Sequence, residues 1–262
     1  MSSGSHNNIV DFRNDRTALP CGGTGRGSER RKVMKVLMVN GSPYAKGNTY
    51  IALHEAEEEF KRNGVDVQMM NIGMKDIRGC IACGKCAETG KCVFDDAVNE
   101  AAPLFEEADG LIVGTPVYYA SANATLVAFL DRLFYSTHFD KTMKVGASVV
   151  VARRGGLSAT FDELNKYFTI SGMPVASSYY WNSVHGRKPG EAAGDAEGLY
   201  NMRVLARNMT FLMKSIALGK EKYGMPETEE HAWTHFVRAD LFKGKGTLSR
   251  CKLVPLKVPF LP

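Results

Sequence analysis

The chain has 262 residues, of which 44% are hydrophobic and 23% are charged, a composition typical of a globular protein. Its net charge of +5 is small, and its lysines and arginines are scattered among acidic residues, so nucleic-acid binding is not indicated. The sequence contains no apolar run of the roughly 18 residues that a membrane helix needs. We therefore expect neither a nucleic-acid nor a membrane partner.

The N-terminal part of the chain predicts an extension in front of the folded domain. Residues 1–32 are rich in Ser, Gly, Asn and Arg and show no apolar periodicity, which is typical of a mobile segment. The N-terminus also lacks the apolar core of a secretory signal, so we expect a cytoplasmic protein. In that compartment thiols stay reduced, and clustered cysteines indicate metal or redox chemistry rather than disulfides.

An apolar segment at residues 33–40 runs into the loop Gly-Ser-Pro-Tyr-Ala-Lys-Gly-Asn-Thr, residues 41–49, and helical periodicity follows. This pattern predicts a buried parallel strand, a turn and a helix start, where small residues and backbone N–H groups suit an anionic phosphate. An ordinary strand-to-helix connection is the alternative, and neither the Walker A nor the dinucleotide glycine pattern is present. The candidate phosphate ligands are Ser42, Lys46, Gly47, Asn48 and Thr49.

The remaining elements alternate along the chain. Apolar patterns predict strands at residues 33–40, 65–70, 111–114, 145–152 and 173–180. Helical periodicity follows them at residues 53–60, 98–105, 126–134, 157–168 and 199–216. Pro103 should kink or restart the second helix, because proline removes a hydrogen-bond donor. This alternation predicts a doubly wound, five-stranded parallel α/β sheet of strand order 2-1-3-4-5.

The predicted order brings three loops to the carboxyl edge of the sheet, where ligands bind in such folds. The loop Thr115-Pro116-Val117-Tyr118-Tyr119 offers a stiff backbone and aromatic or hydroxyl groups, unless its tyrosines simply pack at a strand end. In the loop at 153–156, Gly155 and Gly156 let the backbone approach a flat ligand closely. The two arginines of that loop face either phosphates or solvent.

The loop at 41–49, the segment 114–119 and the Ala-Phe-Leu-Asp-Arg sequence at 128–132 together resemble the flavodoxin-like NAD(P)H-dependent FMN reductase family. The resemblance extends over residues 34–218 and implies a flavodoxin-like domain at 33–219, with noncovalent FMN held by the loops named above. It also implies NAD(P)H as co-substrate and a homodimer or homotetramer with the flavin near a subunit interface. Residues 220–262 are expected to form an extension packed on the domain or on a dimer partner.

A cysteine-rich insertion at 76–96 contains Cys80, Cys83, Cys86 and Cys92, spaced C-x2-C-x2-C-x5-C. Three cysteines at steps of three wrap around one centre, as in ferredoxin loops that hold a [4Fe–4S] cluster. The fourth cysteine falls at x5 and no proline follows it, so the motif is not the bacterial ferredoxin run. It resembles the compact cysteine motif of iron–sulfur flavoproteins, a branch of the same family. Structural zinc, a redox-active thiol pair, or cysteines without any cluster remain as alternatives.

The predicted function is an FMN-dependent oxidoreductase with no catalytic side chain, because the flavin carries the chemistry. It would pass electrons from NAD(P)H or a protein donor to a small-molecule acceptor of the quinone, azo or nitro type, or through the cluster. One alternative is a ferredoxin-linked electron carrier without a nicotinamide site. A reductase whose cysteine loop holds no cluster and a zinc-containing binding module are the others. His185 lies either at the flavin edge or on the surface, and His6, Cys21 and Cys251 are assigned no role.

Overall fold

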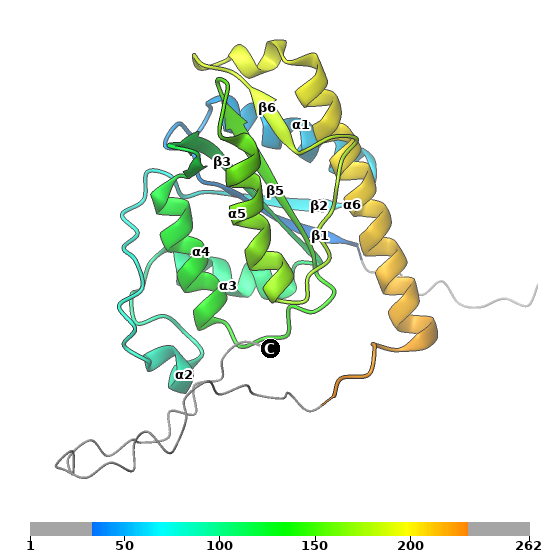
Figure 1. Cartoon of the computed structure of the whole chain (residues 1–262). Helices are drawn as coiled ribbons and strands as arrows, with labels where there is room; N and C mark the ends of the chain where they lie inside the picture. Colours follow the sequence, from blue (N-terminus) through cyan, green and yellow to red (C-terminus); the bar gives the residue numbers. More distant parts are fainter. Residues whose placement is uncertain (1–32, 230–262) are drawn as a thin grey trace, which may run out of the picture. The chain divides into compact units, whose positions relative to one another are not determined.

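A parallel sheet forms the centre of the computed structural model, which describes residues 33–229 (Figure 1). The expected extension at 1–32 and residues 230–262, with His6, Cys21 and Cys251, lie outside the described residues. The strands are β1 (Lys35–Asn40), β2 (Asp66–Asn71), β3 (Gly110–Tyr118), β4 (Ser121–Ala122), β5 (Val145–Ala152) and β6 (Ser183–His185). Their order is β2-β1-β3-β5-β6, with β4 paired antiparallel to the end of β3. Without β4 this matches the predicted order 2-1-3-4-5, except that β6 takes the place of the predicted fifth strand at 173–180.

Helices cover both faces of the sheet, which explains the nearly continuous apolar sequences of the central strands. Every residue of β5 is buried, and β1 is buried from its second residue onward. On one face Phe105, Phe129 and Phe168 come from three different helices and belong to one core cluster. On the other face Phe60 and Met209 belong to a second cluster. Figure 1 shows the two layers, with α3, α4 and α5 on one side and α1 and α6 on the other.

Each of the five predicted helical segments lies within a helix of the structure. The helices are α1 (Asn48–Arg62), α2 (Lys85–Thr89), α3 (Ala97–Glu107), α4 (Ala124–Ser136), α5 (Leu157–Ile170), the short 3₁₀ helix η1 (Glu191–Gly194) and α6 (Ala196–Tyr223), of which α2 and η1 have no predicted counterpart. Asp96 caps α3 and Asp195 caps α6, each accepting a backbone N–H of the first turn. Helix α3 continues through Pro103, so the predicted restart there is wrong. Among residues 33–229, no helix is both long and apolar enough to cross a membrane.

The predicted fifth strand at 173–180 is wrong. Only Val175 of that segment pairs with the sheet, through a single bridge to Gly146 near the start of β5. The chain then leaves the sheet, with Tyr179 79% exposed, and returns at β6, which pairs with the end of β5. Two short segments therefore share the edge of β5. The Pro174 carbonyl and the Ala176 N–H bond Gly146, and further along β5 the Val150 N–H bonds the carbonyl of Asn182 instead.

Candidate functional site

The loops that follow β1, β3, β5 and β6 meet at the carboxyl edge of the sheet around an open pocket of about 300 Å³. This is the edge at which doubly wound sheets bind ligands. More than half of the predicted cofactor residues line the pocket. They are Ser42, Gly47, Asn48, Thr49, Pro116, Val117 and Tyr118.

The loop after β1 is held rigidly and leaves the start of α1 available. The Ser42 N–H donates to Asn40 Oδ1 at 3.0 Å, and the Ser42 hydroxyl accepts from the Tyr44 N–H at 3.1 Å. Gly47 is the N-cap of α1, and no side chain of the described residues caps this helix end. A Cβ at Gly47 would lie 2.8 Å from that of Tyr44, so the turn requires glycine. The uncapped N–H groups and the positive end of the helix dipole suit an anion.

The amide of Asn48 holds the loop at 188–192. Its Nδ2 donates to the Lys188 carbonyl at 2.9 Å, while its Oδ1 accepts from the N–H groups of Gly190 at 3.0 Å and Ala192 at 3.2 Å. The Asn48 side chain, which was predicted to bond phosphate, therefore forms its hydrogen bonds within the protein. A Cβ at Gly186 would lie 2.8 Å from Asn48 Nδ2, which shows how closely the two loops approach.

The Thr115 hydroxyl forms hydrogen bonds inside the loop at 115–119. Thr115 is fully buried, and its hydroxyl donates to the Pro116 carbonyl at 2.9 Å and accepts from the Asn123 N–H at 2.9 Å. Asn123 also donates to the Gly41 carbonyl at 2.6 Å, so the first two loops are joined. Tyr118 lines the pocket, and burial, with a smaller contribution from Tyr44, raises the pKa of its hydroxyl.

The β3–β4 turn and the third loop are in direct contact. Tyr119 is fully exposed and has a φ of 52°, in the left-handed region that disfavours a residue with a side chain. Gly156 has a φ of +87°, and a Cβ there would lie 2.8 Å from the Cα of Ala120. Gly156 thus lets the third loop approach the turn. Among the described residues that line the pocket, five of the predicted cofactor residues are missing: Lys46, Thr115, Tyr119, Gly155 and Gly156.

The pocket also includes residues that the sequence reasoning missed or left open. Arg153, which was predicted to face either phosphates or solvent, and Arg187 both line the pocket and bring positive charge to its edge. Arg187 lies in a Gly/Pro-containing segment whose sequence predicts a loop before the last helix and gives no sign of a binding site. The other unexpected lining residues are Tyr44, Val151, Ala152, Gly186 and Pro189.

His185 contacts the start of α6. Its Nδ1 lies 3.3 Å from Asp195 Oδ2, and its backbone N–H donates to the same oxygen at 2.6 Å. Burial tends to raise the pKa of Asp195, but hydrogen bonds from Gly198 and His185 together lower it. Asp195 therefore stays ionised as the cap of α6. His185 borders a neighbouring open hollow with Arg153 and Arg187.

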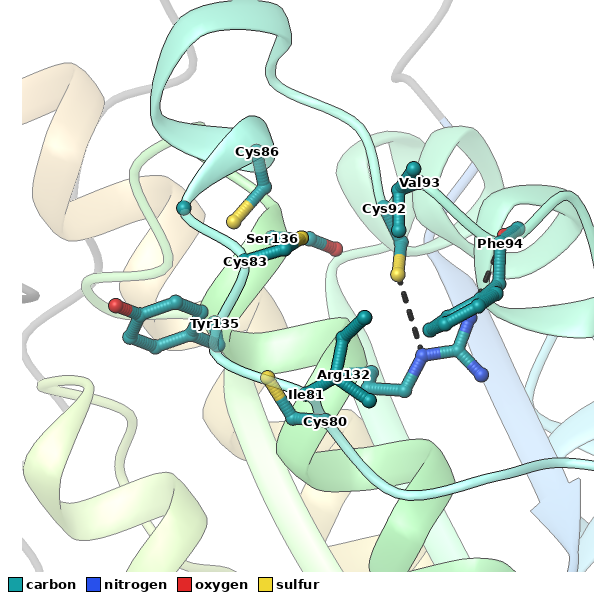
Figure 2. A pocket seen from close by; sticks show the side chains of 11 residues that line it. Cys80, Ile81, Cys83, Cys86, Cys92, Val93, Phe94, Arg132, Tyr135 and Ser136 are labelled. Atoms are coloured by element: carbon teal, nitrogen blue, oxygen red, sulfur yellow. Dashed lines mark hydrogen bonds between the residues drawn. The ribbon is translucent and has the colours of Figure 1, made fainter.

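All four predicted metal-ligand cysteines line one small cavity of about 20 Å³, together with residues of α4 (Figure 2). Figure 2 shows the sulfur atoms of Cys80, Cys86 and Cys92 around a common space. Cys80 and Cys83 are exposed and Cys86 is buried. Burial, followed by the neighbouring thiols, raises the pKa of Cys86. Within residues 33–229, no three Cys, His, Asp or Glu side chains converge closely enough to hold a single metal ion.

Arg132 of α4 is the functional candidate that the sequence reasoning missed at this second site. Its side chain is 1% exposed, and its Nε donates to the sulfur of Cys92 at 3.2 Å. The sequence contains a signal for this residue, because helical periodicity places Arg132 beside Phe129 and Leu133 on the buried face of the helix. A buried arginine needs polar partners.

Comparisons with known proteins identify the family of this chain. The family model described as NADPH-dependent FMN reductase matches residues 34–188. An iron–sulfur flavoprotein of Methanocaldococcus jannaschii is 32% identical over 191 residues, which cover 70% of this chain and 99% of that protein. An iron–sulfur flavoprotein of Methanosarcina thermophila is 30% identical over 199 residues, which cover 72% of this chain and 100% of that protein.

Solved structures share the fold. An NAD(P)H:quinone oxidoreductase from Methanothermobacter marburgensis has a TM-score of 0.53 at 16% identity, covering 68% of this chain and 96% of that chain. RosB, solved with a bound 8-demethyl-8-formylriboflavin-5′-phosphate intermediate, has a TM-score of 0.56 at 14% identity, covering 79% and 94% respectively. At these identities the likeness shows the doubly wound α/β fold alone.

Proposed function

This chain belongs to the NADPH-dependent FMN reductase family, within its iron–sulfur flavoprotein branch, and we propose from this that it passes electrons from NAD(P)H or a protein donor through FMN to an acceptor of the quinone, azo or nitro type. The observation that carries the proposal is the uncapped N-terminus of α1 at a pocket lined by the predicted loops. Anions bind at such helix starts.

The residues around the pocket divide the work of holding FMN. The backbone N–H groups at the start of α1, with the hydroxyls of Ser42 and Thr49, would hold the phosphate, and Arg153 and Arg187 add positive charge. Pro116 and Tyr118 would lie against the flavin ring and exclude water from it. When bound, FMN supplies the hydride and electron chemistry, and the protein supplies its position and surroundings.

We propose a [4Fe–4S] cluster at Cys80, Cys83, Cys86 and Cys92. Their common cavity supports this assignment, as does the cysteine spacing. In a cubane cluster each cysteine binds a different iron, so the sulfurs stand farther apart than around one tetrahedral zinc ion. The choice of a cluster over zinc rests on the cysteine spacing and the shared cavity, because among the described residues no group of side chains is arranged to hold a metal ion.

The two proposed sites lie at opposite ends of α4. Asn123, its N-cap, bonds the phosphate loop, whereas Tyr135 and Ser136 near its C-terminal end border the cysteines. The helix has 13 residues and is therefore about 20 Å long. Electrons that pass between the sites within one chain must cover much of this length. A homodimer or homotetramer that brings the FMN of one chain near the cysteines of another would shorten the path, and we retain this assembly as a prediction.

The test is an anaerobic visible spectrum with iron, sulfide and zinc analysis of the same purified sample. Flavin bands with a broad shoulder near ~400 nm and about four irons per chain would support both cofactors. Flavin without iron would leave an FMN reductase whose cysteine loop has another role. A colourless protein that contains zinc would contradict the proposal.

Replacing Cys83 with Ser should remove the iron and leave FMN bound, because the two sites use different loops. Metal analysis and flavin fluorescence after denaturation would measure both quantities in one preparation. The matched control is Cys251→Ser, outside the proposed ligand set, which should keep its iron. Full iron content in the Cys83→Ser variant would refute the cluster assignment.

A second candidate function is supported by the exposure of Cys80 and Cys83, which would leave the cluster open to a protein electron donor such as ferredoxin. In that case the protein is an electron carrier without a nicotinamide site. Steady-state oxidation of NADPH with menadione as acceptor separates the two candidates. Turnover favours the reductase, whereas reduction by ferredoxin alone favours the carrier.

A further inference from the structure

We infer that Arg132 is a positioning residue for the proposed cluster, which fixes the Cys92 thiolate in place and raises the reduction potential of the cluster. The inference rests on the proposed function, because it requires a cluster at the four cysteines. It adds a residue that is not itself a metal ligand, and it gives that residue a measurable effect.

Every N–H of the Arg132 guanidinium has a partner. Nε donates to Cys92 Sγ at 3.2 Å, and the two Nη atoms form a fork on Asp96, at 2.7 Å to Oδ2 and 3.0 Å to Oδ1. The remaining donors reach the carbonyls of Arg78 at 3.2 Å and Phe94 at 3.3 Å. A guanidinium has five N–H donors in a rigid plane, so these contacts leave it one orientation. Its Nε–H therefore stays directed at the sulfur (Figure 2).

The Cys92 segment is held from a second side by α3. The Cys92 N–H donates to Asn99 Oδ1 at 3.0 Å, and Asn99 Nδ2 donates back to the Cys92 carbonyl at 3.0 Å. The ring of Phe94 lies 5.0 Å from the Arg132 guanidinium carbon, within the range of a cation–π contact. Helices α3 and α4 thus fix both the backbone and the sulfur of this cysteine. The other three cysteines lie on the loop and the short helix α2 at residues 80–86.

This arrangement has an electrostatic consequence for any cluster that Cys92 ligates. The positive Nε–H end of the Arg132–Asp96 pair faces the sulfur, and the carboxylate lies on the far side of the guanidinium. The pair is largely withdrawn from water, since Arg132 is 1% and Asp96 23% exposed. A fixed positive charge stabilises the added electron of a reduced cluster, and N–H···S hydrogen bonds raise cluster potentials.

Three variants of the full-length protein test the inference: Arg132→Met, Arg132→Lys and Asp96→Asn. Methionine matches the apolar bulk without a charge or a donor, and lysine keeps the charge without the fork. Asparagine at 96 can still cap α3 through its side-chain oxygen, but it removes the negative charge that balances Arg132. The measurements are iron and sulfide per chain, the EPR signal of the reduced cluster, and the midpoint potentials of cluster and FMN in one anaerobic titration.

The expected shifts of the cluster potential have opposite signs. Arg132→Met should lower the potential, Arg132→Lys should lie between it and the wild type, and Asp96→Asn should raise the potential. The FMN potential should stay unchanged in all three, because the flavin site lies at the other end of α4. A role limited to structural support would not produce opposite shifts.

The outcomes separate this inference from the proposed function. A wild-type protein with FMN but no iron would overturn the cluster, and this inference with it. If the wild type holds a cluster and the cluster potential in Arg132→Met and Asp96→Asn equals that of the wild type, the inference alone is overturned. A shift of the potential in the same direction in both variants would also overturn it. If Arg132→Met loses its iron, the inference depends on whether the cluster potential rises in Asp96→Asn. Loss of iron from all three variants would also overturn the inference.

Discussion

Polar side chains near the proposed flavin pocket form hydrogen bonds within the protein. The amide of Asn48 makes three hydrogen bonds to the loop at 188–192, and the Thr115 hydroxyl bonds Pro116 and Asn123. A buried polar group left without a partner costs about 1–3 kcal/mol, so the bonds of the fully buried Thr115 hydroxyl maintain the shape of its loop. The groups that then remain for the proposed phosphate site are the start of α1 and the hydroxyls of Ser42 and Thr49.

Replacing Thr49 with Ala should weaken FMN binding roughly five- to tenfold, because one hydrogen bond contributes about 1 kcal/mol. Thr49 lines the pocket and is almost fully buried. Titration of the apoprotein with FMN, followed by flavin fluorescence, measures the affinity. Thr169→Ala, at an exposed position of α5, is the control and should bind FMN as the wild type does. Equal affinity in both variants would argue against the phosphate role.

The glycine pair of the third loop supplies a matched test. Gly156→Ala places a Cβ 2.8 Å from Ala120 at a φ of +87°, whereas a Cβ at Gly155 would have no described atom within 4 Å. We expect Gly156→Ala to reduce the free energy of unfolding by about 1–3 kcal/mol and to weaken FMN binding. Gly155→Ala should change neither by much. Urea denaturation and FMN titration of both variants measure the difference, and equal effects would contradict this reading of the turn.

At the scale of elements, α1 connects the proposed flavin site to the rest of the fold. Its N-terminus faces the pocket, and Leu53, Ala56 and Phe60 form its buried stripe against the sheet. Its outer side is tied to α6, since Glu59 accepts from Arg207 at 2.7 Å and also from Arg62 at 2.8 Å. The contacts between α1 and α6 therefore help to hold the helix whose N-terminus is the proposed phosphate site.

The Glu59 contacts predict a dependence of stability on pH. The hydrogen bond from Arg207, stronger than the opposing effect of burial, lowers the pKa of Glu59 below its usual value. The ionised carboxylate therefore stabilises the fold fully above the unfolded pKa near ~4.3, and this contribution is lost as the pH falls through the lower, folded pKa. Glu59→Gln should cost about 1 kcal/mol at pH 7 and flatten the loss of stability in acid.

Urea denaturation at pH 7 and at pH 3–4 measures this effect. The control is Glu58→Gln, because Glu58 is 42% exposed and pairs with Lys61 at the surface. A surface pair of this kind contributes less than about 1 kcal/mol, so this variant should follow the wild type at both pH values. If Glu59→Gln showed the same acid sensitivity as the wild type, Glu59 would not be the group responsible.

At the scale of the whole molecule, the loops around the proposed flavin pocket follow four strands, and hydrogen bonds such as that from Asn123 to the Gly41 carbonyl join them. A ligand that contacts these loops together should stabilise the native state by mass action. FMN at one hundred times its Kd should add about 2.7 kcal/mol, a rise in Tm of roughly 5–10 °C for a domain of this size.

Thermal unfolding of the apoprotein with and without FMN tests this expectation. Riboflavin has the same ring and lacks the phosphate, so at the same concentration it should raise the Tm by less. Equal shifts with the two ligands would show that the start of α1 does not hold the phosphate. No shift with either ligand would contradict flavin binding at this pocket.

The sequence by itself determined the local elements and their order. Strands β1, β3 and β5 lie where continuous apolar runs predict them, because a strand covered on both faces needs apolar side chains on both sides. Helices α4 and α5 follow from apolar positions repeating at helical spacing, and the carboxyl edge follows from the alternation of strands and helices. The cysteine cavity was also predictable, since three of its cysteines lie on one short loop.

Only the tertiary structure decided which distant residues meet. Asn48 bonds Lys188 across 140 positions, and Arg132 reaches Cys92 across 40, so no local pattern could assign their partners. The predicted fifth strand failed for the same reason, since the short polar segment Ser183–His185, which has no apolar pattern, takes the end of the β5 edge. Local propensity depends on neighbours in the chain, whereas hydrogen-bond and ion-pair partners depend on the packing of the whole domain.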